Sequence, residues 1–282
     1  MTGSAPRAPR LTYDLALAEA DYPRWEGPPR RTLVICTHQR SGSSLLGEAI
    51  TFAGDMGTPL EYFHRGFRPS FAQRWGSSGT EAYVADLHRY RTDPGGTLAV
   101  KLFWQDVADI AVERDPALER LRAIAPGDVP PGLYRRVRAI LDALLPNATW
   151  VSLERRDTVR QAVSLQRARQ TDVWRDLARH DAASMPEPQY DFAALSDQLH
   201  WILRARDRWN GFFAANEIAP HIITYERMVR DFETCFRDLR ALMGQSAATL
   251  PPTRMRRQAD ALSEAWAHRL LGDLQRRAAC PA

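Results

Sequence analysis

TLVICTHQRSGSSLLGEAITFAG, residues Thr32–Gly54, says more about the fold of this chain than any other stretch. It begins with an apolar, β-branched run that predicts a strand over 32–37. A polar loop with one arginine, one glycine and three serines follows, and apolar residues at helical spacing then predict a helix over 43–53. Because the free amides and the dipole of a helix N-terminus favour negative charge, this order predicts an anion site. The same residues also fit an ordinary Ser/Gly-rich turn.

The loop differs from the two common nucleotide-binding patterns. The pattern G-x-x-x-x-G-K-[ST] of nucleotide hydrolases fails because Thr37 stands at its first glycine and Ser43 at its lysine. The Rossmann pattern G-x-G-x-x-G is not present either. A phosphotransferase with an atypical loop is therefore disfavoured, and no Asp after a strand is convincingly placed to hold Mg²⁺.

Length and composition narrow the class of protein. A chain of 282 residues, 44% of them hydrophobic, can bury one large core. No stretch is apolar enough for a secretion leader or a transmembrane segment, so a soluble, cytoplasmic protein is expected. The net charge of +4 is mild and dispersed, which argues against a nucleic-acid partner. The cysteines show no metal-ligand spacing, so no metal and a reducing compartment are expected: Cys36, Cys235 and Cys280.

Strand and helix patterns alternate along the chain. Apolar strands separated by helices predict an α/β fold, a P-loop-like parallel sheet with helices on both faces. Residues 1–30 are expected to form an irregular lead-in and 31–282 a single α/β domain, in which 181–190 is a mobile connection near the mouth of the site. The expected strands are 32–37, 97–103, 148–154 and 220–224, and the expected helices are 43–53, 79–91, 131–145, 157–178, 191–216, 225–243 and 252–271.

A second anion site is expected within residues 151–175, VSLERRDTVRQAVSLQRARQTDVWR. Arg155 ends a strand, Asp157 is placed as the N-cap of the next helix, and Ser164 lies on the same helix face as Asp157. Arg155 and Ser164 can therefore hold one tetrahedral anion between them. Taken alone, these residues fit a surface helix with many salt bridges equally well.

Three segments resemble one known family. QRSGSSLL (39–46), RRDTVRQAVSLQRARQTDVW (155–174) and MRRQADALSEAWAHRL (255–270) are similar to bacterial sulfotransferases of the trehalose sulfotransferase-like family. That family uses 3′-phosphoadenosine 5′-phosphosulfate (PAPS) as donor, and it has arginine where other sulfotransferases have a loop lysine. The resemblance spans 32–270, is weak between the three segments, and implies the sulfotransferase fold.

The resemblance also implies an activity. It implies transfer of a sulfuryl group from PAPS to a hydroxyl of a carbohydrate or carbohydrate-containing acceptor, without a metal. The expected partner is a small-molecule or glycolipid acceptor, and a homodimer is an open expectation because the family includes dimers. Segments 62–96 and 105–147, which would shape the acceptor pocket, are unlike the trehalose enzyme, so the acceptor need not be trehalose. An atypical phosphotransferase, or a non-catalytic module that binds adenosine bisphosphate, remains as an alternative.

Positions that match the family's motifs imply a set of donor-binding residues. The first loop is expected to hold the phosphosulfate end of PAPS, and Arg155 and Ser164 the 3′-phosphate. The C-terminal segment is a further contact by resemblance, although its residues fit equally an amphipathic helix that docks on the core. The full expected set is Gln39, Arg40, Ser41, Gly42, Ser43, Ser44, Arg155, Ser164, Arg257 and Gln258.

The resemblance makes Glu61 the general base, in a P-x-E-F/Y-F element at 59–63. Its apolar neighbours are expected to desolvate the carboxylate and raise its pKa. His64 is the alternative base. Lys101, in the family's K-L-x-W element, is the only lysine among 38 basic residues. Together with Arg40, it is expected to stabilise charge on the sulfonate or on the leaving 5′-phosphate.

The acceptor side carries weaker signals. Trp104 either stacks on an acceptor sugar or fills the core, and the residues do not distinguish the two roles. Gln170 and Trp174, from the family's Q-T-x-x-W element, are further candidates for the acceptor pocket.

Overall fold

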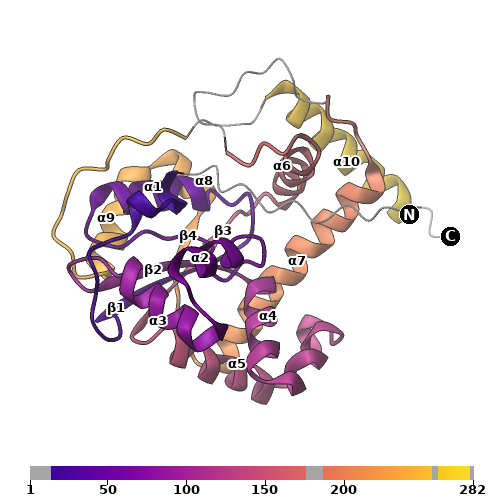
Figure 1. Cartoon of the computed structure of the whole chain (residues 1–282). Coiled ribbons are helices and arrows are strands. Elements are labelled where there is room, and N and C mark those ends of the chain that lie inside the picture. The colour runs from indigo at the N-terminus through magenta and orange to yellow at the C-terminus, as the bar shows by residue number, and fades with distance from the viewer. Residues whose placement is uncertain (1–13, 176–186, 256–259, 280–282) are drawn as a thin grey trace, which may run out of the picture.

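The computed structural model describes residues 14–175, 187–255 and 260–279, which surround a four-stranded parallel sheet (Figure 1). The strands are β1 Arg31–Thr37, β2 Thr97–Phe103, β3 Ala148–Glu154 and β4 His221–Thr224, in the order β2-β1-β3-β4. Val34 of β1 lies opposite Val100 of β2 and Trp150 of β3. The expected α/β fold with a parallel sheet is confirmed, and each expected strand agrees with an observed one to within a residue at either end.

The strand order creates a switch point at the carboxyl end of the sheet. From β1 the chain crosses to β2 on one side, whereas β3 and β4 lie on the other side of β1. In open parallel sheets, ligands bind at such a point, outside the carboxyl ends of the strands. The loops after β1 and β3 border it, and these are the loops of the two expected anion sites.

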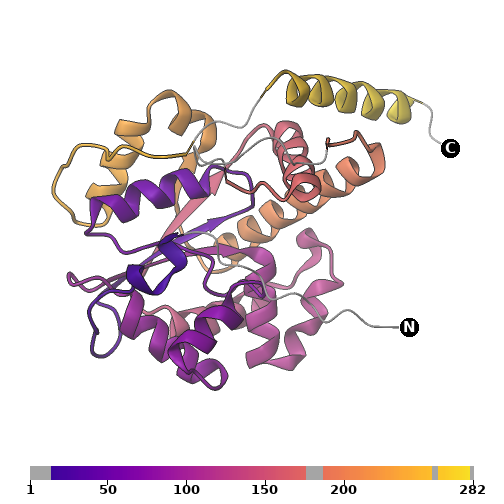
Figure 2. The same ribbon diagram turned by 45° about the horizontal axis from the view of Figure 1, so that its top comes forward.

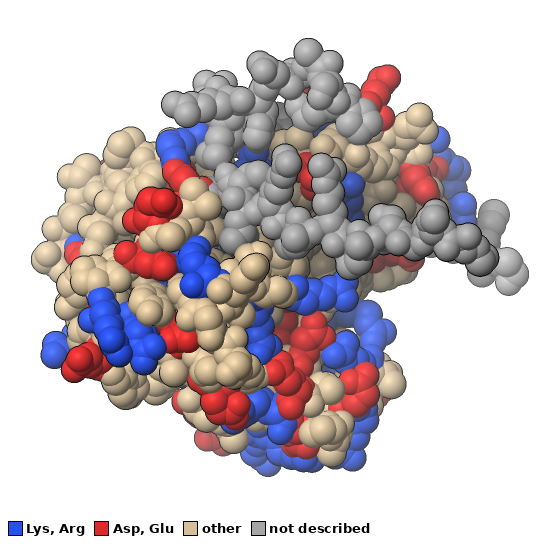
Figure 3. All heavy atoms as spheres, viewed as in Figure 1, with Lys and Arg blue, Asp and Glu red and all other residues tan. Residues whose placement is uncertain are grey.

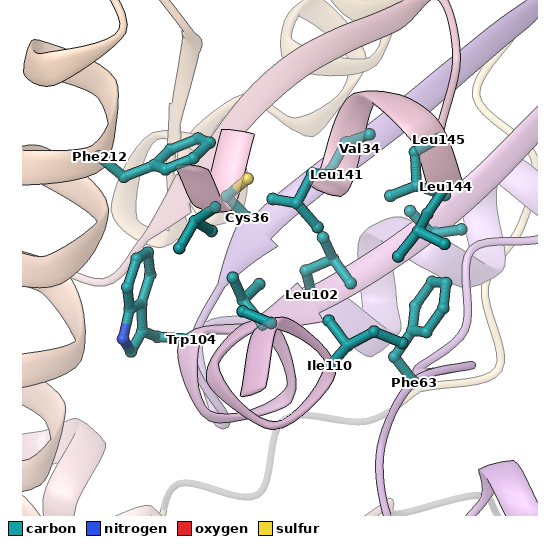
Figure 4. Packing of buried hydrophobic residues seen from close by; sticks show 14 of the residues in the cluster. Val34, Cys36, Phe63, Leu102, Trp104, Ile110, Leu141, Leu144, Leu145 and Phe212 are labelled. Carbon is teal, nitrogen blue, oxygen red and sulfur yellow. The ribbon is translucent and has the colours of Figure 1, made fainter. Parts of the chain in front are cut away.

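Helices cover both faces of the sheet, because alternate residues of each strand point to opposite sides. Val34, Cys36 and Leu102 pack against helices α3, α4, α5 and α7 on one face (Figure 4). Ile35 and Leu153 pack against α1 and α9 on the other face. The helices are α1 Ser43–Ala53, α2 Arg68–Trp75, α3 Gly79–Arg91, α4 Trp104–Arg114, α5 Pro131–Leu144, α6 Thr158–Thr171, α7 Phe192–Ala215, α8 Tyr225–Arg230, α9 Phe232–Leu242 and α10 Ala261–Ala279.

Three expected helices have different ends. The helix expected over 157–178 stops at Thr171, because Asp172 takes a left-handed backbone conformation with φ of 57°. The helix expected over 225–243 is two helices, since Asp231 ends α8 and its carboxylate accepts a hydrogen bond from the N–H of Thr234 in α9. The last helix begins at Ala261 instead of residue 252. Residues 181–186 of the expected mobile connection lie outside the described residues.

The sequence patterns do not predict α2 and α4. In α4, Trp104, Val107, Ile110 and Ala111 are buried at helical spacing, directly after the last residue of β2. The apolar run of the strand therefore continues into the helix and hides the boundary. The sequence patterns likewise do not predict the short 3₁₀ helices Pro116–Arg122 and Pro126–Asp128, and two more, Asp14–Ala16 and Ala18–Ala20, lie in the lead-in.

A second layer, formed by α6, α7 and α10, lies beyond the sheet (Figure 2). Trp266 and Leu270 of α10 pack with Val163 of α6 and Leu195 of α7. Two arginines of α6 pair with carboxylates at the start of α10, Arg160 with Glu264 and Arg167 with Asp260. These contacts fix the position of α6, which carries part of the second expected anion site. Among the described helices, none has the length and apolar character that crossing a membrane requires.

Residues 14–30 run along the body of the protein. Arg91 of α3 has no exposed side-chain surface and pairs with Asp21 at 2.9 Å. Its guanidinium also donates hydrogen bonds to the carbonyls of Leu15, Leu17 and Ala20. One buried arginine therefore ties residues 15–21 of this lead-in to α3.

Candidate active site

The loop after β1 is braced from inside. The Oγ of Ser41 is 2.6 Å from the Oγ1 of Thr37, which also donates a hydrogen bond to the carbonyl of Leu153 in β3. Ser41 is fully buried, so its hydroxyl shapes the loop. From the other side, the amide of Gln161 in α6 donates a hydrogen bond of 2.8 Å to the carbonyl of Gln39. The loop is therefore held to both neighbouring elements at the switch point.

Gly42 is required at the start of α1. Its φ is 88°, and a Cβ at this position would lie 2.6 Å from Cε of Met228 and 2.8 Å from Cδ2 of Tyr225. A side chain would thus push the loop away from α8. Gly42 is the N-cap of α1 and provides no side-chain cap for the first turn, which includes Ser43 and Ser44. Such a helix end suits an anion.

Two arginines converge on this loop. The Nε of Arg40 donates a hydrogen bond of 2.9 Å to the Oγ of Ser164. Nη1 of Arg155 is 3.4 Å from the carbonyl of Arg40, and its guanidinium lies 4.7 Å above the ring of Tyr225. Burial lowers the pKa of Arg40 to about 10, and the adjacent charge of Arg155 adds to this effect. The two expected anion sites are thus one continuous cluster, in which Ser164 contacts Arg40.

Pairing of Leu60 with the edge strand β2 places Glu61 next to Lys101. Leu60 forms a parallel bridge with Val100, and the N–H of Lys101 donates a hydrogen bond of 2.9 Å to the carbonyl of Leu60. The Nζ of Lys101 lies 2.8 Å from Oε1 of Glu61, with 1% and 9% of these side chains exposed. Nη2 of Arg175 lies 3.8 Å from Oε2 of the same carboxylate. The candidate base is therefore a buried carboxylate between two cations.

This arrangement corrects the expected pKa of Glu61. Burial raises the pKa, as the sequence predicts, but the charges of Lys101 and Arg175 outweigh burial and lower the pKa to about 2. Burial lowers the pKa of Lys101, and Glu61 opposes that change. The expectation of a raised pKa is wrong for this state of the protein, because the lysine partner is absent from the local sequence around Glu61.

Two further ionisable groups lie near Glu61. His64, the alternative base, accepts a hydrogen bond at Nδ1 from the N–H of Gly66, and burial lowers its pKa. Asp106 in the first turn of α4 is buried, and burial together with the charge of Glu61 raises its pKa to about 8. Glu61 is thus the ionised carboxylate of this pair at neutral pH, whereas Asp106 is largely protonated.

The three acceptor candidates lie in different surroundings. Trp104 is 7% exposed and packs edge-to-face against Tyr134 and Trp209 within the core. The side-chain amide of Gln170 exchanges two hydrogen bonds with the backbone of Gln189. Trp174 is 37% exposed, and its carbonyl accepts a hydrogen bond of 2.6 Å from Arg40. The structure thus brings only Trp174 of these three into contact with the loop. Arg257 and Gln258 lie outside the described residues.

A cavity of about 30 Å³ lies behind the loop, between the ends of β1 and β3 and helices α6 and α7. His38 and Trp209 line it, and among the described residues neither His38 Nε2 nor Trp209 Nε1 has a hydrogen-bond partner. Burial lowers the pKa of His38 to about 4, so its ring is neutral at pH 7. The volume suits a water molecule and is too small for a nucleotide.

The sequence patterns do not identify Arg175 and Asp106 as site residues. Arg175 directly follows the Q-T-x-x-W element, but a helix through residue 178 would have carried its side chain along α6. Asp106 lay in a segment for which no helix was expected. On the described part of the face in Figure 3, acidic and basic atoms are interspersed, without a broad basic patch. Within the described ranges, no group of three or more His, Cys, Asp or Glu residues could hold a metal ion.

Comparison with known proteins identifies the family. The model of the Stf0 sulphotransferase family matches residues 32–273. Trehalose 2-sulfotransferase of Mycobacterium tuberculosis is 29% identical over 278 residues, which cover 88% of this chain and 96% of that protein. Trehalose 2-sulfotransferase of Mycolicibacterium smegmatis is 25% identical over 264 residues, which cover 88% of this chain and 97% of that protein.

Among solved structures, a sulfotransferase domain from the curacin biosynthetic pathway aligns with 84% of this chain and 83% of its own, at 13% identity and a TM-score of 0.45. The family match covers both expected anion segments and the Glu61 and Lys101 elements. The resemblance seen in the sequence is thereby confirmed, and the chain belongs to the Stf0 sulphotransferase family.

Proposed function

We propose that this protein transfers a sulfuryl group from PAPS to a hydroxyl of a carbohydrate or carbohydrate-containing acceptor. One observation carries the proposal: two consecutive residues contact the buried carboxylate and the loop after β1, residues 38–42, which we call the anion loop. The carbonyl of Trp174 accepts a hydrogen bond from Arg40, and the guanidinium of Arg175 lies 3.8 Å from Glu61. Consecutive Cα atoms are about 3.8 Å apart. The loop arginine and the candidate base are therefore linked through one two-residue segment.

The residues around the loop fit a donor that carries anions at two ends of its ribose. The first turn of α1 after Gly42 suits the phosphosulfate end. Arg155 and Ser164 suit a second anion, the 3′-phosphate. An anion there would also relieve the repulsion between Arg40 and Arg155, which lowers the pKa of Arg40. When bound, PAPS supplies an activated sulfonate and a bisphosphate leaving group.

Glu61 is the group that receives the acceptor's proton in this proposal. Sulfuryl transfer to a hydroxyl needs a base, stabilisation of charge on the transferring group, and in-line geometry. With a pKa of about 2, Glu61 is ionised at neutral pH but weakly basic. An anionic sulfonate beside Lys101 and Arg175 would offset their charge and raise the pKa of Glu61. The base would then gain strength only when the donor is present.

A carbohydrate acceptor is supported by the two mycobacterial relatives, both of which are trehalose 2-sulfotransferases. Trp174 offers a partly exposed aromatic ring beside the loop, a surface that suits the apolar face of a sugar. Trp104 packs in the core, and the amide of Gln170 is occupied by Gln189. We therefore favour Trp174 over these two as the acceptor contact.

A ligand experiment separates this proposal from its alternatives. Thermal unfolding is measured with adenosine 3′,5′-bisphosphate and, separately, with ATP and Mg²⁺. Stabilisation by the bisphosphate is expected, since a ligand that binds the folded state raises the melting temperature. Stabilisation by ATP and Mg²⁺ alone would favour a phosphotransferase. Bisphosphate binding without sulfated product, when the protein is incubated with PAPS and a panel of mono- and disaccharides, would favour a non-catalytic module.

A further inference from the structure

We propose that the two oxygens of Glu61 have different roles: Lys101 holds Oε1, while Oε2 takes the acceptor's proton beside Arg175, which binds the transferring sulfonate. This inference rests on the proposed sulfuryl transfer and adds a catalytic residue to it. It also makes Lys101 a positioning residue, in contrast to the direct role in charge stabilisation that its sequence motif implies.

The two cations hold Glu61 differently. The distance of 2.8 Å from Nζ of Lys101 to Oε1 is that of a charged hydrogen bond. The distance of 3.8 Å from Nη2 of Arg175 to Oε2 is an ion pair too long for a hydrogen bond. An acceptor hydroxyl that donates to Oε2 would therefore lie next to the guanidinium. Oε1, by contrast, faces the ammonium that fixes it.

Exposure separates the two cations further. The side chain of Lys101, a residue of β2, is 1% exposed. The Arg175 side chain is 18% exposed. A ligand that enters from solvent can reach the guanidinium without displacing the lysine. Arginine also presents a planar fork of donors, which matches two oxygens of one sulfonate.

The turn after α6 connects Arg175 with both the anion loop and Glu61. Asp172 has a φ of 57° and ends the helix, and its carboxylate accepts a hydrogen bond of 2.9 Å from Nε1 of Trp174. The carbonyl of Trp174 then accepts the hydrogen bond from Arg40. This described turn is held at both ends, and the residue that follows it reaches Glu61. Trp174 and Arg175 thus link the loop to Glu61 through two consecutive residues.

The step balances without a further reactant. The acceptor oxygen forms a bond to sulfur with its own lone pair, and its proton moves to Oε2 of Glu61. The bond between sulfur and the 5′-phosphate oxygen breaks, and its electron pair stays on that phosphate. The products are the sulfate ester and adenosine 3′,5′-bisphosphate, and Glu61 returns its proton to solvent. Negative charge on the sulfonyl oxygens faces Arg175 throughout.

The ionisable groups around Glu61 define a pH test. They are Lys101 from β2, Arg175 from the turn after α6, Asp106 from α4 and His64 from its own loop. Since Arg175 lowers the pKa of Glu61, its replacement by a neutral residue raises that pKa. The acidic limb of kcat/KM then moves to higher pH, because the base must be ionised to act.

The test compares Arg175→Gln and Arg175→Lys with Arg276→Gln, a control on α10 that breaks an exposed ion pair with Asp273 of the same helix. Arg175→Gln is expected to lower kcat about 100-fold or more. Its acidic limb should move upward, while its Kd for adenosine 3′,5′-bisphosphate, which lacks the sulfonate, stays within about twofold of wild type. Arg175→Lys should keep the wild-type acidic limb and part of kcat. Arg276→Gln should change neither quantity.

Two results would overturn the inference. One is an Arg175→Gln enzyme with wild-type kcat and an unmoved acidic limb. The other is a parallel loss of bisphosphate binding and of kcat in both Arg175 variants, which would assign Arg175 to the fold of the loop. Both results leave the proposed function standing, because wild-type transfer is measured in the same series. Absence of transfer by the wild-type enzyme would instead contradict the proposed function itself.

Discussion

Glu61 and Lys101 form a buried ion pair, and this burial determines how much the pair contributes to the stability of the fold. A buried ion pair adds little net stability, but removing one partner leaves a charge uncompensated. The sequence predicts both residues through their motifs, and it predicts that Glu61 is desolvated. It does not predict their contact, because the bridge between Leu60 and Val100 joins segments about forty residues apart. The error in the expected pKa of Glu61 has the same origin.

Replacement of Lys101 by Met is expected to destabilise the protein by about 3–5 kcal/mol, because Glu61 stays buried without its main cation. The double variant Glu61→Leu/Lys101→Met should recover most of that loss, since no buried charge remains. Urea unfolding at pH 7 measures both values. A single variant as stable as wild type would show that the pair is not formed in solution.

At the scale of elements, the sequence predicts the strand, loop and helix of β1 and α1 correctly because the strands are buried. Apolar strands are visible because every residue of β2 and nearly every residue of β1 is buried. Helix ends were harder to predict, since nothing in RARQTDVW marks a stop as glycine or proline would, and Asp172 takes the left-handed conformation instead. That one error hid the turn that carries Arg175 to Glu61.

Gly42→Ala is expected to weaken binding of adenosine 3′,5′-bisphosphate about tenfold or more, because a Cβ collides with Met228 and Tyr225 and shifts the loop. Isothermal titration calorimetry measures the change. Gly54→Ala is the matched control: Gly54 ends α1 with φ of 81°, but nothing lies within 4 Å of its Cβ position. The control should lose about 1–2 kcal/mol of stability and bind normally. Equal losses of binding in both variants would show that backbone strain, and not the collision with Met228 and Tyr225, weakens binding.

At the scale of the molecule, α10 braces α6, and α6 supplies two contacts to the anion loop. Trp266 of α10 is 5% exposed and packs with Val163 of α6, while Ser164 and Gln161 of α6 bond the loop. The family resemblance marks the C-terminal segment as functional. The structure shows α10 docked through Trp266 and Leu270, the alternative that the sequence left open, but local sequence cannot reveal which helices lie beneath α10.

Trp266→Ala is expected to cost about 3–5 kcal/mol of stability, since it opens a cavity between α6, α7 and α10. It should also raise the Kd for adenosine 3′,5′-bisphosphate at temperatures where the protein stays folded, because α6 is less firmly held. Leu271→Ala on the same helix, where 43% of the leucine is exposed, should cost within about 0.5 kcal/mol and leave binding unchanged. Normal binding by a destabilised Trp266→Ala protein would show that α10 does not influence the binding site.

In the proposed mechanism, Glu61 takes the acceptor's proton during sulfuryl transfer from PAPS. The most direct measurement is the rate at which wild type and Glu61→Gln form a sulfated saccharide from PAPS, together with the Kd of each for adenosine 3′,5′-bisphosphate. General-base catalysis contributes about 10²–10⁴-fold, so the variant should lose that factor in kcat and keep its bisphosphate Kd. A Glu61→Gln enzyme that transfers the sulfuryl group at the wild-type rate would contradict the claim.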